Sequence, residues 1–266
     1  MELLQRTWKV LCASVQGASH KASGVPCQDR WATQEFSGPH EQFLILSCAD
    51  GAGSASHAEH GAQAACAAFL RAAIRELGEG RALGQFRRVD ALAIFREALL
   101  AIDAEAERLH QPADELATTL LGAVVGDSDA MFFQIGDGAM VVRQGGTYRP
   151  VFWPYSGEYA DSTVFVTSSR AGDLLSFEVR HERVEEIALF TDGLERLLLR
   201  FAERAAHAPF FEPVFRSLRE APSATELQEP FERLLESPRV NDRTNDDKTL
   251  LLATRLSPDH ACRNDL

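Results

Sequence analysis

Several acidic residues in this sequence occur at the same kind of place, directly beside a short apolar run. A carboxylate at the end of a strand lies at the rim of a sheet, and a following glycine lets the backbone turn sharply and present its carbonyl oxygen there. If the fold gathers these rims, they form an all-oxygen site of the kind that Mg²⁺ and Mn²⁺ bind. The pairs concerned are Gln28-Asp29, Asp50-Gly51, Asp137-Gly138, Asp192-Gly193 and Asp246-Asp247.

Each pair also has a purely structural interpretation. Asp-Gly is a strong two-residue hairpin signal, and it fits Asp137-Gly138 well because apolar runs flank it on both sides. Asp50 and Asp192 precede helical patterns, so each could instead cap a helix N-terminus. The spacing alone does not decide between these alternatives.

The elements that would position these residues follow from hydrophobic periodicity. The apolar run 43–49 is short and ends in Asp-Gly, which favours a buried strand. Apolar residues then recur at steps of three and four, which predicts amphipathic helices over about 57–78 and 86–110, with glycines between them. Two further strands are predicted at 187–191 and 249–256.

The middle of the chain changes to strand patterns. The runs 119–125, 130–135 and 139–143 predict an antiparallel meander, and 144–184 reads as short strands and long loops. Three helical segments, broken by Pro209 and Pro222, are predicted from the runs 194–201, 208–219 and 224–236.

This grouping of strands and helices favours an α+β fold in which helices cover a sheet sandwich, rather than alternating βαβ units. No repeat or linker divides the chain, so we expect a single domain over 1–256 and a polar tail over 257–266.

Composition narrows the function classes. The chain has 266 residues and a formal charge of −12, so it has no long-range positive field that would attract nucleic acid or an anionic membrane. A chain of this length buries enough surface to fold without a structural metal, which leaves any metal free to be functional.

The cysteines indicate a reducing compartment. Their number is odd and their spacing is neither that of a zinc site nor of a redox motif, so they are expected to be packing residues: Cys12, Cys27, Cys48, Cys66 and Cys262. The N-terminal segment 1–18 lacks the pattern of a signal peptide, and no run is long enough to span a membrane. We therefore expect a cytoplasmic protein.

Beyond these patterns, the sequence resembles the metal-dependent serine/threonine protein phosphatases of the PPM or PP2C type, in their bacterial form. The resemblance covers essentially the whole chain and keeps the order of the family's motifs. The matching segments are GVPCQDRW (24–31), CADGAGSASHAEHGA (48–62), TTLLGAVV (118–125), FFQIGDGAMVV (132–142), ALFTDGLERL (188–197) and NDDKTLLLA (245–253).

The resemblance implies a PP2C-like sandwich of two antiparallel β-sheets flanked by helix pairs (αββα), with two Mn²⁺ or Mg²⁺ ions at one edge. Asp50 then resembles the carboxylate that bridges both ions, and the carbonyl of Gly51 a ligand of one. Asp192 and Asp246 resemble the ligands of the other ion.

Other positions match the surroundings of such a centre. Asp137 resembles an aspartate that can join a third, weaker metal, while Gln28 and Asp29 match outer-shell positions. Thr118 and Thr119 match a structural pair. Asp247 stands where Asn is usual, so it either adds outer-shell charge or pairs with Lys248.

The implied reaction is attack of a metal-activated bridging water on a phosphomonoester of a phosphorylated protein, opposing a Ser/Thr kinase. The chain offers no alternative nucleophile. A monomer is expected. Two other functions stay open: a catalytically silent phosphoprotein-binding module on the same fold, and a hydrolase of another phosphoester.

Two departures from the family pattern concern catalysis. Gly24 stands where an Arg usually grips the substrate phosphate, and His20, Lys21 and Arg30 are possible substitutes, although surface solvation is an alternative for each. Ala52 stands where many members have a general-acid His. That role then passes to bound water or to His57 or His60, for which simple exposure is the alternative.

Overall fold

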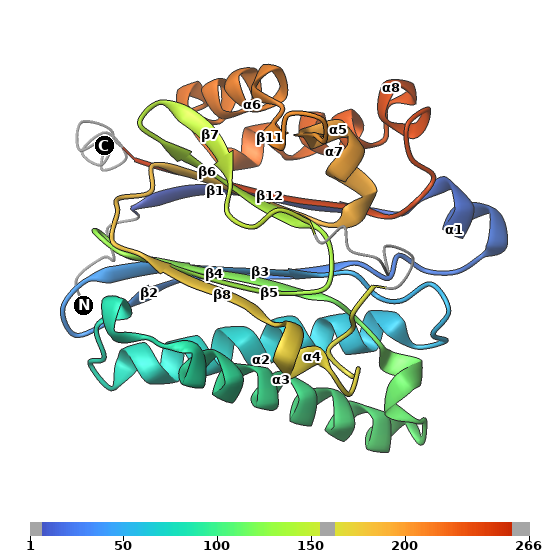
Figure 1. The fold of residues 1–266 in the computed structure, drawn as a ribbon. Helices are drawn as coiled ribbons and strands as arrows, with labels where there is room; N and C mark the ends of the chain where they lie inside the picture. Colours follow the sequence, from blue (N-terminus) through green and yellow to red (C-terminus); the bar gives the residue numbers. More distant parts are fainter. Residues whose placement is uncertain (1–6, 155–162, 257–266) are drawn as a thin grey trace.

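The computed structural model describes residues 7–154 and 163–256 and contains two five-stranded antiparallel sheets stacked face to face (Figure 1). The first sheet has the order β1-β12-β9-β6-β7, and the second has the order β2-β3-β4-β5-β8. The expected α+β sandwich is therefore confirmed.

The strands of the first sheet are β1 (Trp8–Val15), β12 (Lys248–Arg255), β9 (Glu186–Phe190), β6 (Ala139–Gln144) and β7 (Thr147–Pro150). Those of the second are β2 (Arg30–Ser37), β3 (Gln42–Ala49), β4 (Leu120–Val125), β5 (Ala130–Ile135) and β8 (Ser176–Arg180). The expected tail, 257–266, and Cys262 lie outside the described residues.

The central strands read as continuous apolar runs because both of their faces are buried. In β3, Leu44 and Leu46 point into the core between the sheets, whereas Phe43 and Ile45 point toward the helices. Alternate side chains of one strand thus serve two different cores.

Long helices cover the second sheet, as Figure 1 shows. They are α2 (Ala58–Gly78) and α3 (Arg88–Leu109), close to the expected 57–78 and 86–110. Phe69 of α2 packs directly on Gly122 of β4, where a Cβ would lie 2.3 Å from the ring. Only glycine admits this close approach of helix and sheet.

Short helices cover the first sheet. They are α5 (Glu195–Leu198), α6 (Ala208–Glu220), α7 (Gln228–Leu235) and α8 (Pro238–Asn241), with the two-residue strands β10 (Leu199–Arg200) and β11 (Ala205–Ala206). Pro209 does not break a helix as expected, because it occupies the first turn of α6, where no amide hydrogen is needed.

The remaining elements are short. Two helices are α1 (Ala18–Ser23) and α4 (Ala171–Leu174), and the 3₁₀ turns are η1 (Leu83–Gln85), η2 (Ala113–Leu116), η3 (Asp192–Leu194) and η4 (Ala224–Leu227). Among the described residues, no helix is long and apolar enough to cross a membrane.

The expected meander is wrong at its third strand. β4 and β5 pair, but β6 pairs with β9 in the other sheet, so the residues around Asp137-Gly138 carry the chain from one sheet to the other. The hairpin interpretation of this Asp-Gly pair is therefore wrong. Filling both sheets of the sandwich takes precedence over the local turn preference.

The described cysteines are free, and three of them are buried. Burial raises the pKa of Cys27 and of Cys66 to about 12. Both thiols therefore stay protonated near neutral pH. Cys66 of α2 packs in the core beneath this helix, as the sequence predicts, whereas Cys27 is only partly buried and belongs to none of the described core clusters.

Candidate metal centre

Strand pairing places the acidic residues at one edge of the sandwich. In the second sheet Arg30 pairs with Ala49, so Asp29 immediately precedes one strand and Asp50 immediately follows its neighbour. Asp29 is completely buried. Two carboxylates distant in sequence are thereby brought to the same rim.

The first sheet supplies the other two aspartates in the same way. Asp192 follows β9, and Asp246 precedes β12, its antiparallel neighbour. The two segments touch, since a Cβ on Gly193 would lie 2.1 Å from the carbonyl oxygen of Asp247. Glycine after Asp192 is required for this contact, and not for a hairpin or a helix cap.

The backbone of Asp50 is fixed by two threonines. Its carbonyl oxygen accepts hydrogen bonds from the Thr119 amide at 2.8 Å and the Thr118 hydroxyl at 2.9 Å. Its own amide donates to the Thr119 hydroxyl at 2.9 Å. The helix that follows begins only at Ala58, so Asp50 is not its cap. The expected structural role of the threonine pair is observed.

The four aspartates influence each other strongly. Burial, followed by the charge of Asp29, raises the pKa of Asp50 well above its ordinary value. Burial raises the pKa of Asp192 to about 6 and that of Asp29 to about 7. Asp246 contributes repulsion to Asp50 and Asp192. Among the described residues, no positively charged side chain offsets the repulsion at Asp29, Asp50 and Asp192, which is the condition that a bound cation relieves.

Buried oxygen atoms without hydrogen-bond partners also indicate that this site binds a cation. Gln28 Oε1, Asp29 Oδ1 and Asp192 Oδ1 are buried and accept no hydrogen bond from any described residue. Burying such atoms without a partner is costly, and a hydrated cation would satisfy them. The donor set fits a hard divalent ion.

The carboxylates do not form a finished ligand shell by themselves. Within 7–154 and 163–256, no three His, Cys, Asp or Glu side chains converge closely enough to hold an ion. Mutual repulsion separates anionic side chains. Mg²⁺ in proteins also retains several waters and needs few carboxylates.

Asp137 lies at the crossover between the sheets, next to this cluster. Burial raises its pKa, and the Thr163 hydroxyl donates to it at 2.6 Å. Glu195, which the sequence reasoning missed, accepts a hydrogen bond from the Gly138 amide at 2.8 Å, and burial raises its pKa to about 7. Its position in the segment DGLERL gave no sign that it would reach the crossover.

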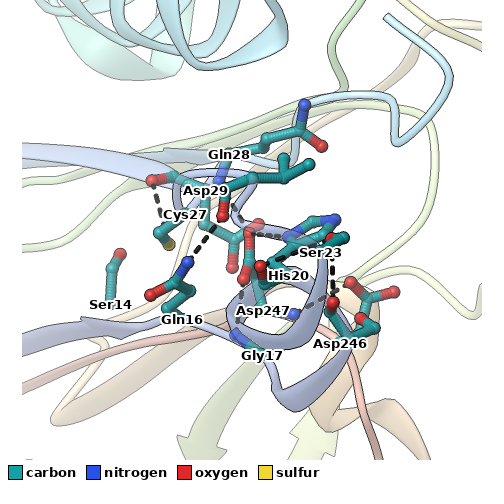
Figure 2. A network of polar contacts seen from close by, with 12 residues as sticks. Ser14, Gln16, Gly17, His20, Ser23, Cys27, Gln28, Asp29, Asp246 and Asp247 are labelled. Carbon is teal, nitrogen blue, oxygen red and sulfur yellow. Dashed lines mark hydrogen bonds and ion pairs between the residues drawn. The ribbon is translucent and has the colours of Figure 1, made fainter. Parts of the chain in front are cut away.

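Asp247 connects the loop between β1 and β2 to the start of β12 (Figure 2). Its carboxylate accepts from the amides of Gly17 and Gln28, both at 2.6 Å, and pairs with His20 Nδ1 at 2.9 Å. The alternative of a salt bridge to Lys248 is wrong. The Lys248 ammonium donates to Asn241 instead, at 2.8 Å.

Gly24, at the position of the usual phosphate-binding Arg, caps α1 with φ 72° and has no atom within 4 Å of a Cβ position. Of the possible substitutes, Lys21 forms an exposed ion pair with Glu236. Arg30 donates to the backbone carbonyls on either side of Gln28, so surface solvation is not its role.

His57 and His60, which follow the Asp50-Gly51 pair in the sequence, differ in their contacts. His57 caps α2 without a side-chain hydrogen bond, whereas His60 Nδ1 lies 3.0 Å from Glu105 of α3. Its ring is thus held against a neighbouring helix. Nearby, the Ser56 hydroxyl donates to Glu115 at 2.7 Å and acts as a loop anchor.

Comparison with known proteins agrees with this geometry. The profile of the family described as Protein phosphatase 2C matches residues 16–232. Serine/threonine-protein phosphatase 3 of Escherichia coli K12 is 34% identical over 255 residues, which cover 93% of this chain and 98% of the relative.

Solved structures share the fold at low identity. The catalytic domain of the serine/threonine phosphatase PstP, crystallised with two manganese ions, has a TM-score of 0.58 at 15% identity and covers 94% of this chain and 99% of its own. Stp1 of Staphylococcus aureus has a TM-score of 0.57 at 15% identity, covering 96% and 97%. Together with the family match, these findings show that the chain belongs to the protein phosphatase 2C family.

Proposed function

We propose that this protein is a metal-dependent serine/threonine phosphoprotein phosphatase. The observation that carries the proposal is the aspartate cluster at the rim of both sheets, in which burial and neighbouring carboxylates raise the pKa of Asp50 and in which Asp29 and Asp192 have buried oxygens without partners among the described residues. Family membership and the 34% identical relative support the same activity.

The proposed centre holds two Mn²⁺ or Mg²⁺ ions. The side chains of Asp50, Asp192 and Asp246 and the carbonyl oxygen of Gly51 would hold these ions. A third, weaker ion would share Asp137 with Asp192. The matched PstP structure contains two manganese ions, which supports this number.

Ions bound here would supply an activated water and neutralise charge on the phosphoryl group. The protein's own groups fix the geometry. Thr118 and Thr119 hold Asp50 in place, while Thr191 donates to Asp29 at 2.8 Å and Gln28 connects to the Ala55 carbonyl at 3.2 Å. Asp29 and Gln28 thus form the outer shell.

The test is turnover of a phosphothreonine peptide and of p-nitrophenyl phosphate, with Mn²⁺, with Mg²⁺, and after exhaustive chelation. We expect turnover of both substrates that needs Mn²⁺ or Mg²⁺. Activity that survives chelation would contradict the metal mechanism. Binding of the phosphopeptide without turnover would indicate a silent binding module, and turnover of the small phosphate alone would indicate another phosphoester.

The cellular role that we propose is removal of phosphate from proteins that a Ser/Thr kinase has modified, by a monomer in the cytoplasm. A net charge of −12 supports partners other than nucleic acid or anionic membranes.

A further inference from the structure

A cavity of about 360 Å³ lies among the short helices that cover the first sheet. Its walls come from η3, α5, α6, α7 and α8, and most of its lining is apolar. Leu197, Phe210 and Val214 are only partly buried there, and Leu234 is 36% exposed. The volume is within the range of roughly 300–1,000 Å³ that is typical of ligand sites.

The cavity is continuous in the chain with the proposed metal centre. Leu194 in its wall follows the Asp192-Gly193 pair, and Arg243 in its wall shortly precedes Asp246. These two wall segments meet where Gly193 contacts the backbone of Asp247. An occupant of the cavity would therefore lie beside the segments that carry two of the metal-binding aspartates.

The charge of the cavity is opposite to that of the whole chain. The described residues that line it include His207, Arg239 and Arg243 and no acidic residue, although the net charge of the chain is −12. Both arginines are exposed. Apolar walls with basic groups fit an occupant that is itself apolar and acidic.

We propose that this cavity is a docking site for a segment of the phosphoprotein substrate that carries apolar side chains next to acidic ones. The inference rests on the proposed function and adds a substrate class to it. Apolar side chains of the segment occupy the space near Leu234 and Val214, and its carboxylates lie against Arg239 and Arg243. This contact holds the phosphorylated residue near the aspartates without an arginine at the position of Gly24.

The test measures docking and chemistry separately. A phosphothreonine peptide library, randomised at the flanking positions, is selected by binding to the immobilised full chain in Mn²⁺. We expect enrichment of Leu or Phe together with Asp or Glu on one flank. The double variant Arg239→Glu/Arg243→Glu should lose the acidic preference, and Leu234→Glu should lose the apolar one.

Affinity and turnover then quantify the effect with one selected peptide. The double variant should lower kcat/KM for this peptide about tenfold, which corresponds to about 1.4 kcal/mol. Turnover of p-nitrophenyl phosphate should not change, because that substrate is too small to reach the cavity. The double variant should also bind the unphosphorylated peptide more weakly than the wild type does, as measured by fluorescence anisotropy with the metal-free chain. Arg216→Glu, on the same helix layer but outside the cavity, is the matched control.

The inference is overturned if the wild type selects no flanking preference, or if the cavity variants select and bind the same peptides as the wild type. If decanoate binds in the cavity and the wild type selects no peptide preference, the cavity is a site for small amphipathic anions instead. If the wild type turns over neither the selected phosphopeptide nor p-nitrophenyl phosphate, the proposed function is refuted, while a flanking preference that the cavity variants lose would still show the docking site.

Discussion

The two helix layers cover similar sheets in different ways. The second sheet is covered by two long helices, α2 with 21 residues and α3 with 22, whose inner faces are fully packed. The first sheet is covered by α5 to α8, of which the longest, α6, has 13 residues and an internal proline. A cavity lies among these short helices, and its wall segments are continuous in sequence with Asp192 and Asp246. The two long helices pack tightly on their sheet, whereas the layer of short helices contains the proposed docking cavity.

The largest expected effect is on activity, at the two aspartates next to the layer of short helices, α5 to α8, which we call the segmented layer. Asp192→Asn and Asp246→Asn should each abolish metal-dependent turnover, because each removes a negative charge from the proposed metal site. The unfolding free energy of the metal-free protein should not fall, since neutralisation also removes repulsion. Phosphatase assays with limiting Mn²⁺ and urea unfolding of both variants check this. Near-wild-type rates in either variant would show that its aspartate is not a ligand.

The next largest effect is on stability, in the layer formed by the long helices α2 and α3. Phe69→Ala should lower the unfolding free energy by about 3–5 kcal/mol, because the ring is fully buried against Gly122 and the long helix cannot collapse onto the cavity. Phe231→Ala, in the short helix α7, should cost less, since that helix can move inward. Urea denaturation compares the two. Equal losses would mean that the segmented layer is as rigid as the long one.

A smaller effect should appear as pH dependence of the metal-free protein. Burial raises the pKa of Asp192 to about 6 and of Asp29 to about 7, above about 3.9 for an unfolded aspartate. The folded state therefore binds more protons, and its stability should decrease as pH rises from about 4 to about 7.

Mn²⁺ should restore stability at the upper end of this range, because it binds the folded state. Urea midpoints across the range, with Mn²⁺ and with a chelator, check both parts. Stability that rises with pH in the chelated protein would contradict this account of the cluster.

The smallest effect concerns Gly24, which belongs to neither layer. Gly24→Arg should cost about 1–2 kcal/mol of stability because φ is 72°, a left-handed conformation that side chains disfavour. Open space surrounds the Cβ position, so the new side chain can reach for phosphate. KM for p-nitrophenyl phosphate should then fall by up to about tenfold. An unchanged KM in a folded variant would show that this loop does not face the substrate.

The sequence predicted the elements whose burial leaves a clear pattern. Strands buried on both faces appear as apolar runs, and α2 and α3 show regular helical spacing. It did not predict β1 or β2, in which polar residues such as Lys9 and Gln34 interrupt the apolar pattern, and it placed β6 beside β5. Choosing between a hairpin and a crossover depends on the second sheet, which local sequence does not contain.

The candidate site likewise has residues that the sequence revealed and contacts that it did not. The aspartates were found because their residue type and their position at strand ends are visible in the sequence. The pairing of His20 with Asp247 and the contact of Glu195 with Gly138 depend on which loops meet in space. The proposed ligand roles themselves stay predictions that the variants above test.

The position of β12 between β1 and β9 has a consequence for synthesis on the ribosome. The second sheet and its long helices use residues that emerge early, apart from β8, and can fold while translation continues. The first sheet is completed later, because the described partner of β1 is β12, which follows every other described strand in the chain. Asp246, which directly precedes this strand region, reaches its partners at the same late moment. With Asp246 as a proposed metal ligand, a nascent chain is expected to stay inactive until this strand is inserted, and a chain truncated before it is expected to have no phosphatase activity.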